Sequence, residues 1–118
     1  MAVSFIEYKG KKILHIDYSK AKSQEEMINI LHQAEKEFQK SEKRLRSLTD
    51  MTDAYVGLDY MNELKRITPT SFAPKAHKAA ILGVNDLKSI LMKGYNNSTK
   101  GNMLIFRTKQ EALDYLVS

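Results

Sequence analysis

The chain has 118 residues, 42% hydrophobic and 28% charged, a composition that excludes a disordered chain and suits one domain over residues 1–118. It contains no cysteine, which excludes disulfides, thiolate metal sites and cysteine catalysis. Its formal net charge is +5, but the 19 basic residues are scattered among 14 acidic ones, so we expect no nucleic-acid partner.

The first two predicted elements form a hairpin. Residues 3–8 alternate in the period-2 pattern of a strand, and residues 12–17 read as a second strand that is apolar on both faces. The turn between them contains Gly10, which accepts a positive φ. Two strands joined this closely must pair antiparallel, because a parallel crossover needs a dozen residues or more.

Residues 23–67 predict a helix, a strand and a second helix. Ser23 and Glu26 form a capping box for a helix reaching about residue 41. Its apolar stripe has helical spacing and consists of Met27, Ile30, Leu31, Ala34 and Phe38. Residues 44–50 predict a third strand, residues 55–67 a second helix, and the prolines at 69 and 74 a break after it.

The remaining residues predict two further strand–helix pairs. Residues 78–84 are short and apolar, as a buried parallel strand should be. Asn85 then caps a helix that buries Leu87, Ile90 and Leu91 and ends at Gly94. Residues 102–106 predict the fifth strand, and a capping box from Thr108 to Glu111 begins the last helix. The order ββαβαβαβα predicts an α/β fold with about four helices and a five-stranded, mostly parallel sheet whose first strand is antiparallel.

Three strings in this order, EYKGKKILHIDYSKAKSQEE, LTDMTDAY and MLIFRTKQEALDYL, carry a family resemblance. Together with the element order, they resemble the STAS superfamily (sulfate transporter and anti-sigma-factor antagonist), and its SpoIIAA-like branch in particular. The resemblance implies one SpoIIAA-like domain covering essentially the whole chain.

Residues 50–53 are the first candidate site. Antagonists of the STAS superfamily carry an Asp-x-Ser/Thr-Gly string whose hydroxyl is phosphorylated by a partner kinase. The resemblance places Thr52 at the acceptor position and Asp50 at the leading acid, while Asp53 stands where the pattern has Gly. It implies a regulatory module with a protein partner, a kinase or a sigma-factor regulator. The alternative is that Thr52 belongs to an ordinary helix cap or Asx turn.

Residues 53–72 are the second candidate site. They contain more apolar and aromatic side chains than one buried helix face needs: Tyr55, Val56, Leu58, Tyr60, Met61, Leu64, Ile67 and Phe72. SpoIIAA-like proteins also resemble the CRAL-TRIO lipid-carrier fold, which implies a mobile lid over a pocket for an apolar small molecule or lipid. Lys65 and Arg66 would suit an anionic head group or a membrane surface. The alternative is an ordinary helix packed on the sheet.

The sequence favours binding over catalysis. The three histidines have no ligand spacing, so we expect no metal, and no phosphate-binding or nucleophile motif indicates a cofactor or an enzyme. No signal-peptide core or membrane-spanning run occurs, so we expect a cytoplasmic protein, with peripheral membrane association as an open alternative. A homodimer is also left open. Of the two hypotheses, the sequence slightly favours the apolar ligand over the phosphorylated regulator, because Asp53 breaks the regulatory pattern.

Overall fold

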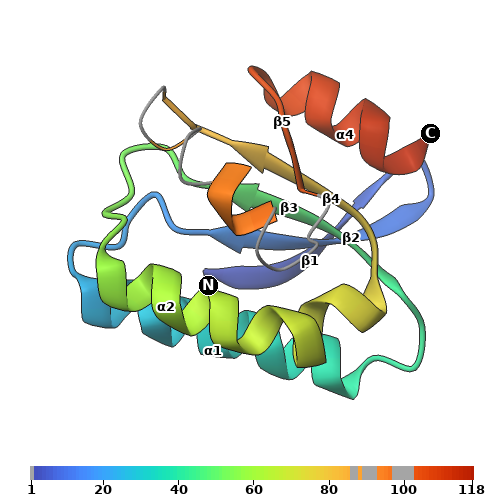
Figure 1. Cartoon of the computed structure of the whole chain (residues 1–118). Helices are drawn as coiled ribbons and strands as arrows, with labels where there is room; N and C mark the ends of the chain where they lie inside the picture. Colours follow the sequence, from blue (N-terminus) through green and yellow to red (C-terminus); the bar gives the residue numbers. More distant parts are fainter. Residues whose placement is uncertain (1, 86–87, 89–92, 97–102) are drawn as a thin grey trace.

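The protein is a five-stranded sheet with helices on both faces (Figure 1). The structure, a computed structural model, describes residues 2–85, 88, 93–96 and 103–118. The strands lie in the order β1 (Val3–Tyr8), β2 (Lys11–Asp17), β3 (Leu45–Asp50), β4 (Ala76–Leu82) and β5 (Met103–Ile105). β1 pairs antiparallel with β2 and all other pairs are parallel, which confirms the predicted fold class.

The β1–β2 hairpin turns over two residues. Lys9 and Gly10 both have positive φ, 49° and 78°, between the paired residues Tyr8 and Lys11. Two consecutive left-handed residues are the signature of a type I′ turn, whose twist matches that of the flanking strands. The expected antiparallel hairpin is therefore confirmed in its detail.

Two helices cover one face of the sheet. α1 (Gln24–Lys40) begins at the predicted cap, where the Ser23 side chain accepts the Glu26 N–H, and it buries all five residues of the predicted stripe. α2 (Leu58–Ile67) starts three residues later than expected, with Gly57 as its N-cap. α2 ends at Ile67, as predicted, and the segment around the two prolines forms a π-helical turn, η1 (Thr68–Phe72), and a 3₁₀ turn, η2 (Ala73–Lys75).

The C-terminal third keeps the predicted order with shifted bounds. β4 starts two residues earlier than expected, and β5 is shorter than the predicted 102–106. Asn85 accepts the Lys88 N–H as a helix cap should, at 3.0 Å, whereas the inward residues predicted for that helix, Leu87, Ile90 and Leu91, lie outside the described residues. Gly94 lies within a helical turn over residues 93–96 and does not end the helix.

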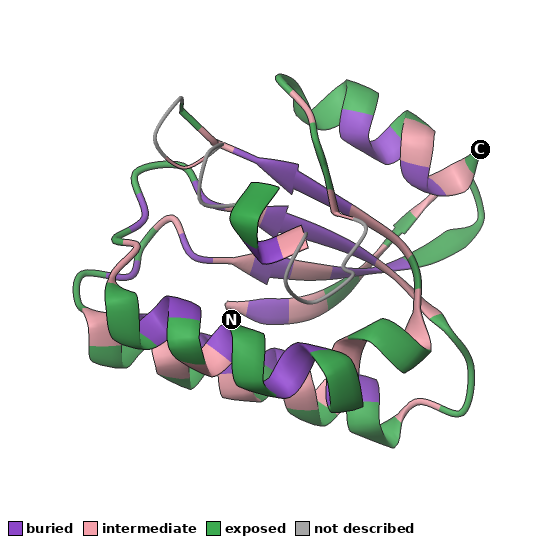
Figure 2. Ribbon diagram, viewed as in Figure 1, coloured by how far each residue is buried: buried purple, intermediate pink, exposed green. Residues whose placement is uncertain are grey.

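The sheet separates two hydrophobic cores, as the burial pattern in Figure 2 shows. Alternate residues of β2 belong to different cores: Leu14 and Ile16 to the first, under α1 and α2, and Ile13 to the second, under α4 (Lys109–Val117). No helix within the described part of the chain is long and apolar enough to cross a bilayer.

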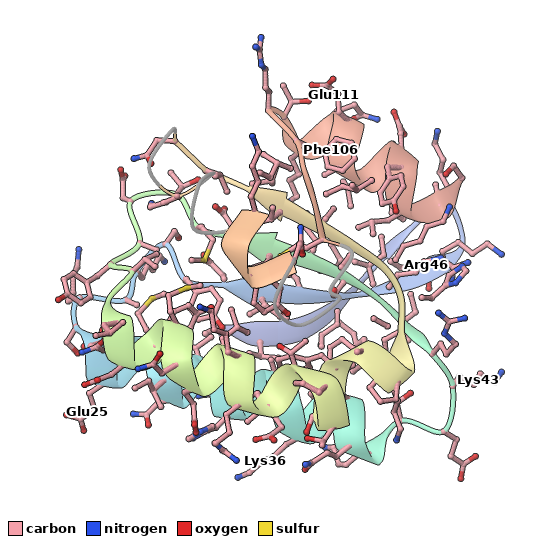
Figure 3. All side chains as sticks on the ribbon, in the orientation of Figure 1. Glu25, Lys36, Lys43, Arg46, Phe106 and Glu111 are labelled. Carbon is pink, nitrogen blue, oxygen red and sulfur yellow. The ribbon has the colours of Figure 1, made fainter. Side chains whose placement is uncertain are left out.

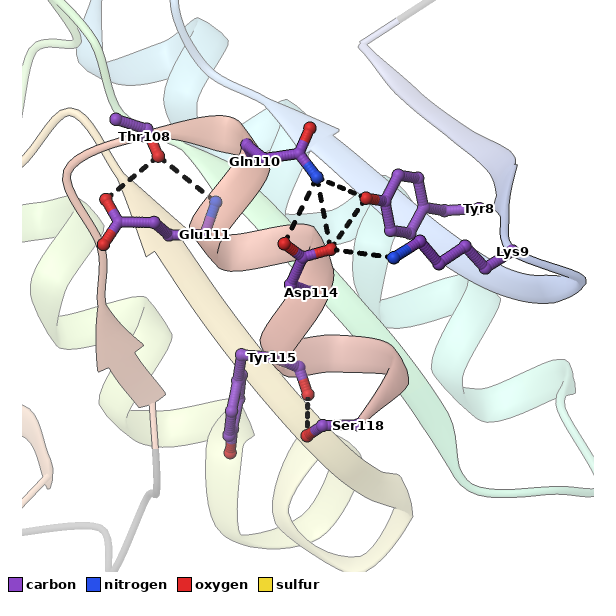
Figure 4. A network of polar contacts seen from close by, with 8 residues as sticks. All are labelled: Tyr8, Lys9, Thr108, Gln110, Glu111, Asp114, Tyr115 and Ser118. Carbon is purple, nitrogen blue, oxygen red and sulfur yellow. Dashed lines mark hydrogen bonds and ion pairs between the residues drawn. The ribbon is translucent and has the colours of Figure 1, made fainter.

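Polar contacts fix α4 to the sheet (Figure 4). Thr108 caps the helix by accepting the Glu111 N–H, and Asp114 accepts the Tyr8 hydroxyl at 2.7 Å, which joins α4 to the hairpin. Arg46 donates to the Leu116 carbonyl at 2.8 Å, and its position beside the helix end is visible in Figure 3. The C-terminal half of α4 is therefore held to both β1 and β3.

Candidate functional site

A cavity of about 220 Å³ lies between the sheet and the α2 segment, within the first core. The sheet contributes side chains of one face: Ile16, Ser47, Thr49, Ala79 and Ile81. The helices contribute mostly apolar side chains: Leu31, Ala34 and Phe38 from α1, Tyr60, Met61 and Leu64 from α2, and Thr68 and Phe72 from η1. Tyr18, Val56 and Tyr95 add to this lining.

The cavity forms where small side chains of the sheet and of α1 face one another. Successive residues of a strand face opposite sides, so Ser47 and Thr49 of β3 and Ala79 of β4 share one face. These small residues and Ala34 of α1 line the cavity where larger side chains would fill it. The larger residues around them keep the sheet and helices apart, which leaves the volume between them empty.

Two hydroxyls of β3 line this cavity without protein partners. Ser47 and Thr49 are buried, with 4% and 5% of their surface exposed. Neither side chain makes a hydrogen bond with any residue that the structure describes, and their oxygens are open to the cavity. The lining is therefore apolar except at a few defined points.

Three tyrosines add phenol side chains to the cavity lining. Tyr18 and Tyr60 pack edge to face, with ring centroids 5.4 Å apart, and burial raises the pKa of both phenols. Thr68 donates to the Leu64 carbonyl at 2.7 Å, and its hydroxyl lies 2.8 Å from that of Tyr95. Because their pKa values are raised, the Tyr18 and Tyr60 phenols stay protonated at neutral pH.

Cations lie among the lining residues, and the residue pattern did not predict them. Arg44 donates twice to the Ala76 carbonyl, at 2.7 and 3.2 Å, and Lys88 donates to the Met51 carbonyl at 2.9 Å. The lining found among the described residues contains no carboxylate. Together with Lys78, these cations give the described lining a positive charge, because the carbonyls that Arg44 and Lys88 contact are neutral.

The predicted lid residues divide between the cavity and the surface. Val56, Tyr60, Met61, Leu64 and Phe72 line the cavity. Ile67 is buried in the first core without lining the cavity, whereas Tyr55 and Leu58 are 53% and 75% exposed. The segment contains the helix α2, which packs on α1 and lines the cavity.

The predicted head-group residues do not reach the cavity. Lys65 and Arg66 are exposed and do not belong to its described lining. Arg66 instead binds Glu63 through two hydrogen bonds, of 2.6 and 2.9 Å. Glu63 also meets His32 of α1 at 2.6 Å, and these two partners lower its pKa to about 2.

The loop at residues 50–53 forms a tight turn at the carboxyl end of β3. Asp50 accepts the Thr52 N–H at 2.9 Å, which is an Asx turn, and Thr52 is exposed. Asp53 has a φ of 56°, the region that glycine favours, so it adopts the backbone conformation that Gly would supply in the regulatory pattern. Gly83, with φ 76°, packs against this turn, where a Cβ would overlap the Thr52 backbone nitrogen.

Among the described residues, no group of three or more His, Asp or Glu side chains could hold a metal ion. Of the predicted site residues, those of the 53–72 segment that line the cavity lie together in the structure. The 50–53 loop is a separate feature of the surface.

Comparison with known proteins gives the fold. No family model matches the chain, and no curated protein matches it. An uncharacterised protein of the DUF3478 family from Shewanella loihica, described as having a SpoIIAA-like fold, is similar in structure. The TM-score is 0.71 at 19% identity, over 98% of this chain and 92% of the other. The chain therefore has a SpoIIAA-like fold.

Proposed function

We propose that this SpoIIAA-like domain is a non-enzymatic binding module that takes up a small apolar molecule between the sheet and α2. The observation that carries this proposal is the cavity of about 220 Å³ in the first core. An engineered cavity of ~150 Å³ lined by apolar side chains already holds benzene, so this volume accommodates a somewhat larger molecule. Protonated tyrosines and the apolar lining favour retention of a neutral compound over its chemical conversion.

The cavity volume also limits the ligand. A membrane acyl chain reaches across half of a hydrocarbon core of ~30 Å, and a diacyl lipid carries two of them. A volume of about 220 Å³ cannot enclose such a molecule. We therefore favour a compound of one or two rings, or a short chain, over an intact phospholipid.

Benzene titration followed by methyl NMR tests this proposal, because the molecule contains its own control. Methyl signals of Leu31, Leu64 and Ile81, which line the cavity, should shift with added benzene. Methyl signals of Ile13 and Leu116, in the second core, should stay in place. Shifts in neither core, or equal shifts in both, would contradict a specific cavity site.

A cavity-filling substitution sharpens the test. Ala79→Leu places three more carbon atoms on the cavity face of β4 and should abolish the benzene-induced shifts. Unchanged second-core signals in this variant would show that the fold is retained. Benzene binding that survives in the folded variant would place the site elsewhere.

Membrane contact is the proposed route by which an apolar ligand enters. Tyr55 and Leu58 are exposed at the start of α2, and Lys65 and Arg66 are exposed further along it. Sedimentation with phosphatidylglycerol vesicles should recover the protein, and Leu58→Asp should reduce recovery more than Phe5→Asp, which alters an exposed apolar residue of β1. Equal recovery of both variants would argue against contact through α2.

Regulation through Thr52 is the second candidate function. It is favoured by the exposed hydroxyl in a turn whose Asp53 has a glycine-like conformation. Phosphopeptide analysis of protein from its native host should then find phosphate on Thr52, and Thr52→Glu should release a kinase or sigma-factor partner that the unmodified protein retains. Absence of phosphate together with unchanged partner binding by Thr52→Glu would remove this candidate.

A further inference from the structure

We infer that the ligand carries a hydrogen-bonding group, such as a phenol, alcohol or carbonyl, and that the hydroxyls of Ser47 and Thr49 bind it. This inference rests on the proposed function and narrows its ligand class from hydrocarbons to small amphiphiles. The observation behind it is a pair of buried hydroxyls that line the cavity and have no partner among the described residues.

The peptide groups of β3 are not available as hydrogen-bond partners for these hydroxyls. β3 pairs with β2 on one side and β4 on the other, and Ser47 and Thr49 belong to both ladders. Their peptide groups are therefore engaged in the sheet. The two residues are two apart on one face, so their Cα atoms lie roughly 6.6 Å apart along the strand. A single oxygen or nitrogen atom between the two side chains can lie within reach of both hydroxyls.

Other positions on this face show how unusual the pair is. The corresponding residues of the neighbouring strands are apolar, with Leu14 and Ile16 on β2 and Ile81 on β4. The buried Thr68, which also lines the cavity, has its hydroxyl hydrogen-bonded to Leu64. Because no enclosed side-chain oxygen or nitrogen of the described residues lacks a partner, the Ser47 and Thr49 oxygens must be open to the cavity, where a bound molecule can reach them.

The charge of the lining disfavours a cationic ligand. Arg44, Lys78 and Lys88 belong to the described lining, which offers no carboxylate to bind a cation. A hydroxyl both donates and accepts, so a phenol, an alcohol or a carbonyl compound can pair with Ser47 and Thr49. An apolar ring or chain then fills the space against Leu31 and Met61.

A matched pair of probes tests the inference, because p-cresol and p-xylene differ only by a hydroxyl in place of a methyl group. Dissociation constants for both are measured by NMR titration on the unmodified protein and on Ser47→Ala/Thr49→Val. We expect the double substitution to weaken p-cresol binding about tenfold or more and to leave p-xylene binding within about twofold. Thr70→Val, which alters an exposed hydroxyl outside the described lining, should leave both values unchanged.

The outcomes separate this inference from the proposed function. If p-xylene binds and the double substitution affects both probes equally, the cavity is a binding site and the inferred role of the two hydroxyls is wrong. If p-cresol binding weakens equally in Thr70→Val, the effect is not specific to the cavity, and the inference also fails. If neither probe binds the unmodified protein, the proposed function is wrong and the inference falls with it.

Discussion

At the scale of single residues, the hydroxyls of two buried threonines lie in different surroundings. Thr68 donates to the Leu64 carbonyl and contacts the Tyr95 hydroxyl, whereas Thr49 lines the cavity without a described partner. Both are almost fully buried, at 1% and 5% exposure. A buried hydroxyl stabilises a protein only when it is paired, because its removal from water costs free energy.

Valine substitutions at these two positions should therefore differ. Thr68→Val should lower the free energy of unfolding by about 1–2 kcal/mol, because it removes two hydrogen bonds at nearly constant shape. Thr49→Val should leave that free energy unchanged within about 0.5 kcal/mol, or raise it. Urea denaturation measures both. A loss at Thr49 as large as that at Thr68 would mean that its hydroxyl is already paired.

Glycine substitutions compare two positions with the same backbone conformation. Gly83 and Gly10 have φ of 76° and 78°, but only Gly83 would bring a Cβ against another segment, the Thr52 backbone. Gly10→Ala should cost about 1–2 kcal/mol of stability, the cost of a left-handed alanine. Gly83→Ala should cost at least about 1 kcal/mol more, because the 50–53 turn must move. Equal losses of stability in the two variants, measured by thermal denaturation, would show that the 50–53 turn moves at no cost in free energy.

At the scale of elements, an ion-pair cluster joins α1 to α2. Glu63 of α2 binds His32 of α1 and Arg66 of its own helix, and its side chain is 21% exposed. The hydrogen bond from Arg66, then that from His32, lowers the pKa of Glu63 from 4.5 to about 2. A carboxylate whose folded-state pKa is lowered stabilises the fold above its unfolded pKa and loses that contribution as the pH falls through the folded value.

The cluster predicts a defined pH dependence. Stability should decline between about pH 4.5 and pH 2 as Glu63 becomes protonated, and Glu63→Gln should reduce this decline. Glu37→Gln is the matched control, because Glu37 pairs with Lys40 within α1 and joins no second helix. Denaturation at pH 7 and pH 3 gives the comparison. The same pH slope in Glu63→Gln as in the unmodified protein would contradict the assigned role of the pair.

The sequence predicts elements well where periodicity and caps agree. The capping boxes at Ser23 and Thr108 and the stripe of α1 each depend on neighbouring residues, so a local pattern contains the information. The end of α2 at Ile67 was predicted, but the helical turns after it were not, because Pro69 and Pro74 normally stop a helix. Here both stand near the start of new helical turns, where their missing N–H groups cost little. Packing beneath η1, including Phe72 against Phe38, supports these turns.

At the scale of the whole molecule, the fold is predictable from the sequence and the cavity is not. The alternation of strands and helices requires a mostly parallel sheet, and the short hairpin requires an antiparallel first strand. The cavity depends on small residues from α1, β3 and β4 meeting in space, which no local pattern reveals. The lid residues were partly found because their excess of apolar side chains is visible in sequence. Ser47 and Thr49 were missed, although polar residues in a central strand are a signal worth examining.

Ligand binding should stabilise the molecule as a unit, because the cavity exists only when sheet and helices are packed together. With free p-cresol at ten times its dissociation constant, the added stability is about 1.4 kcal/mol. For a domain of this size, that corresponds to a rise in the melting temperature of roughly 4–8 °C. Ala79→Leu should show no such rise. An equal rise in that variant would indicate binding outside the cavity.

The empty volume also bears on how the protein responds to hydrostatic pressure. Water fills internal voids when a protein unfolds, so the unfolded form occupies less volume and pressure favours it. A cavity of about 220 Å³ per molecule corresponds to roughly 130 mL per mole, which exceeds the usual volume changes of unfolding, and the part of it that water does not fill in the folded protein contributes to the volume change. The unliganded protein should therefore unfold at moderate pressure, and an occupied or filled cavity should make it resistant to compression.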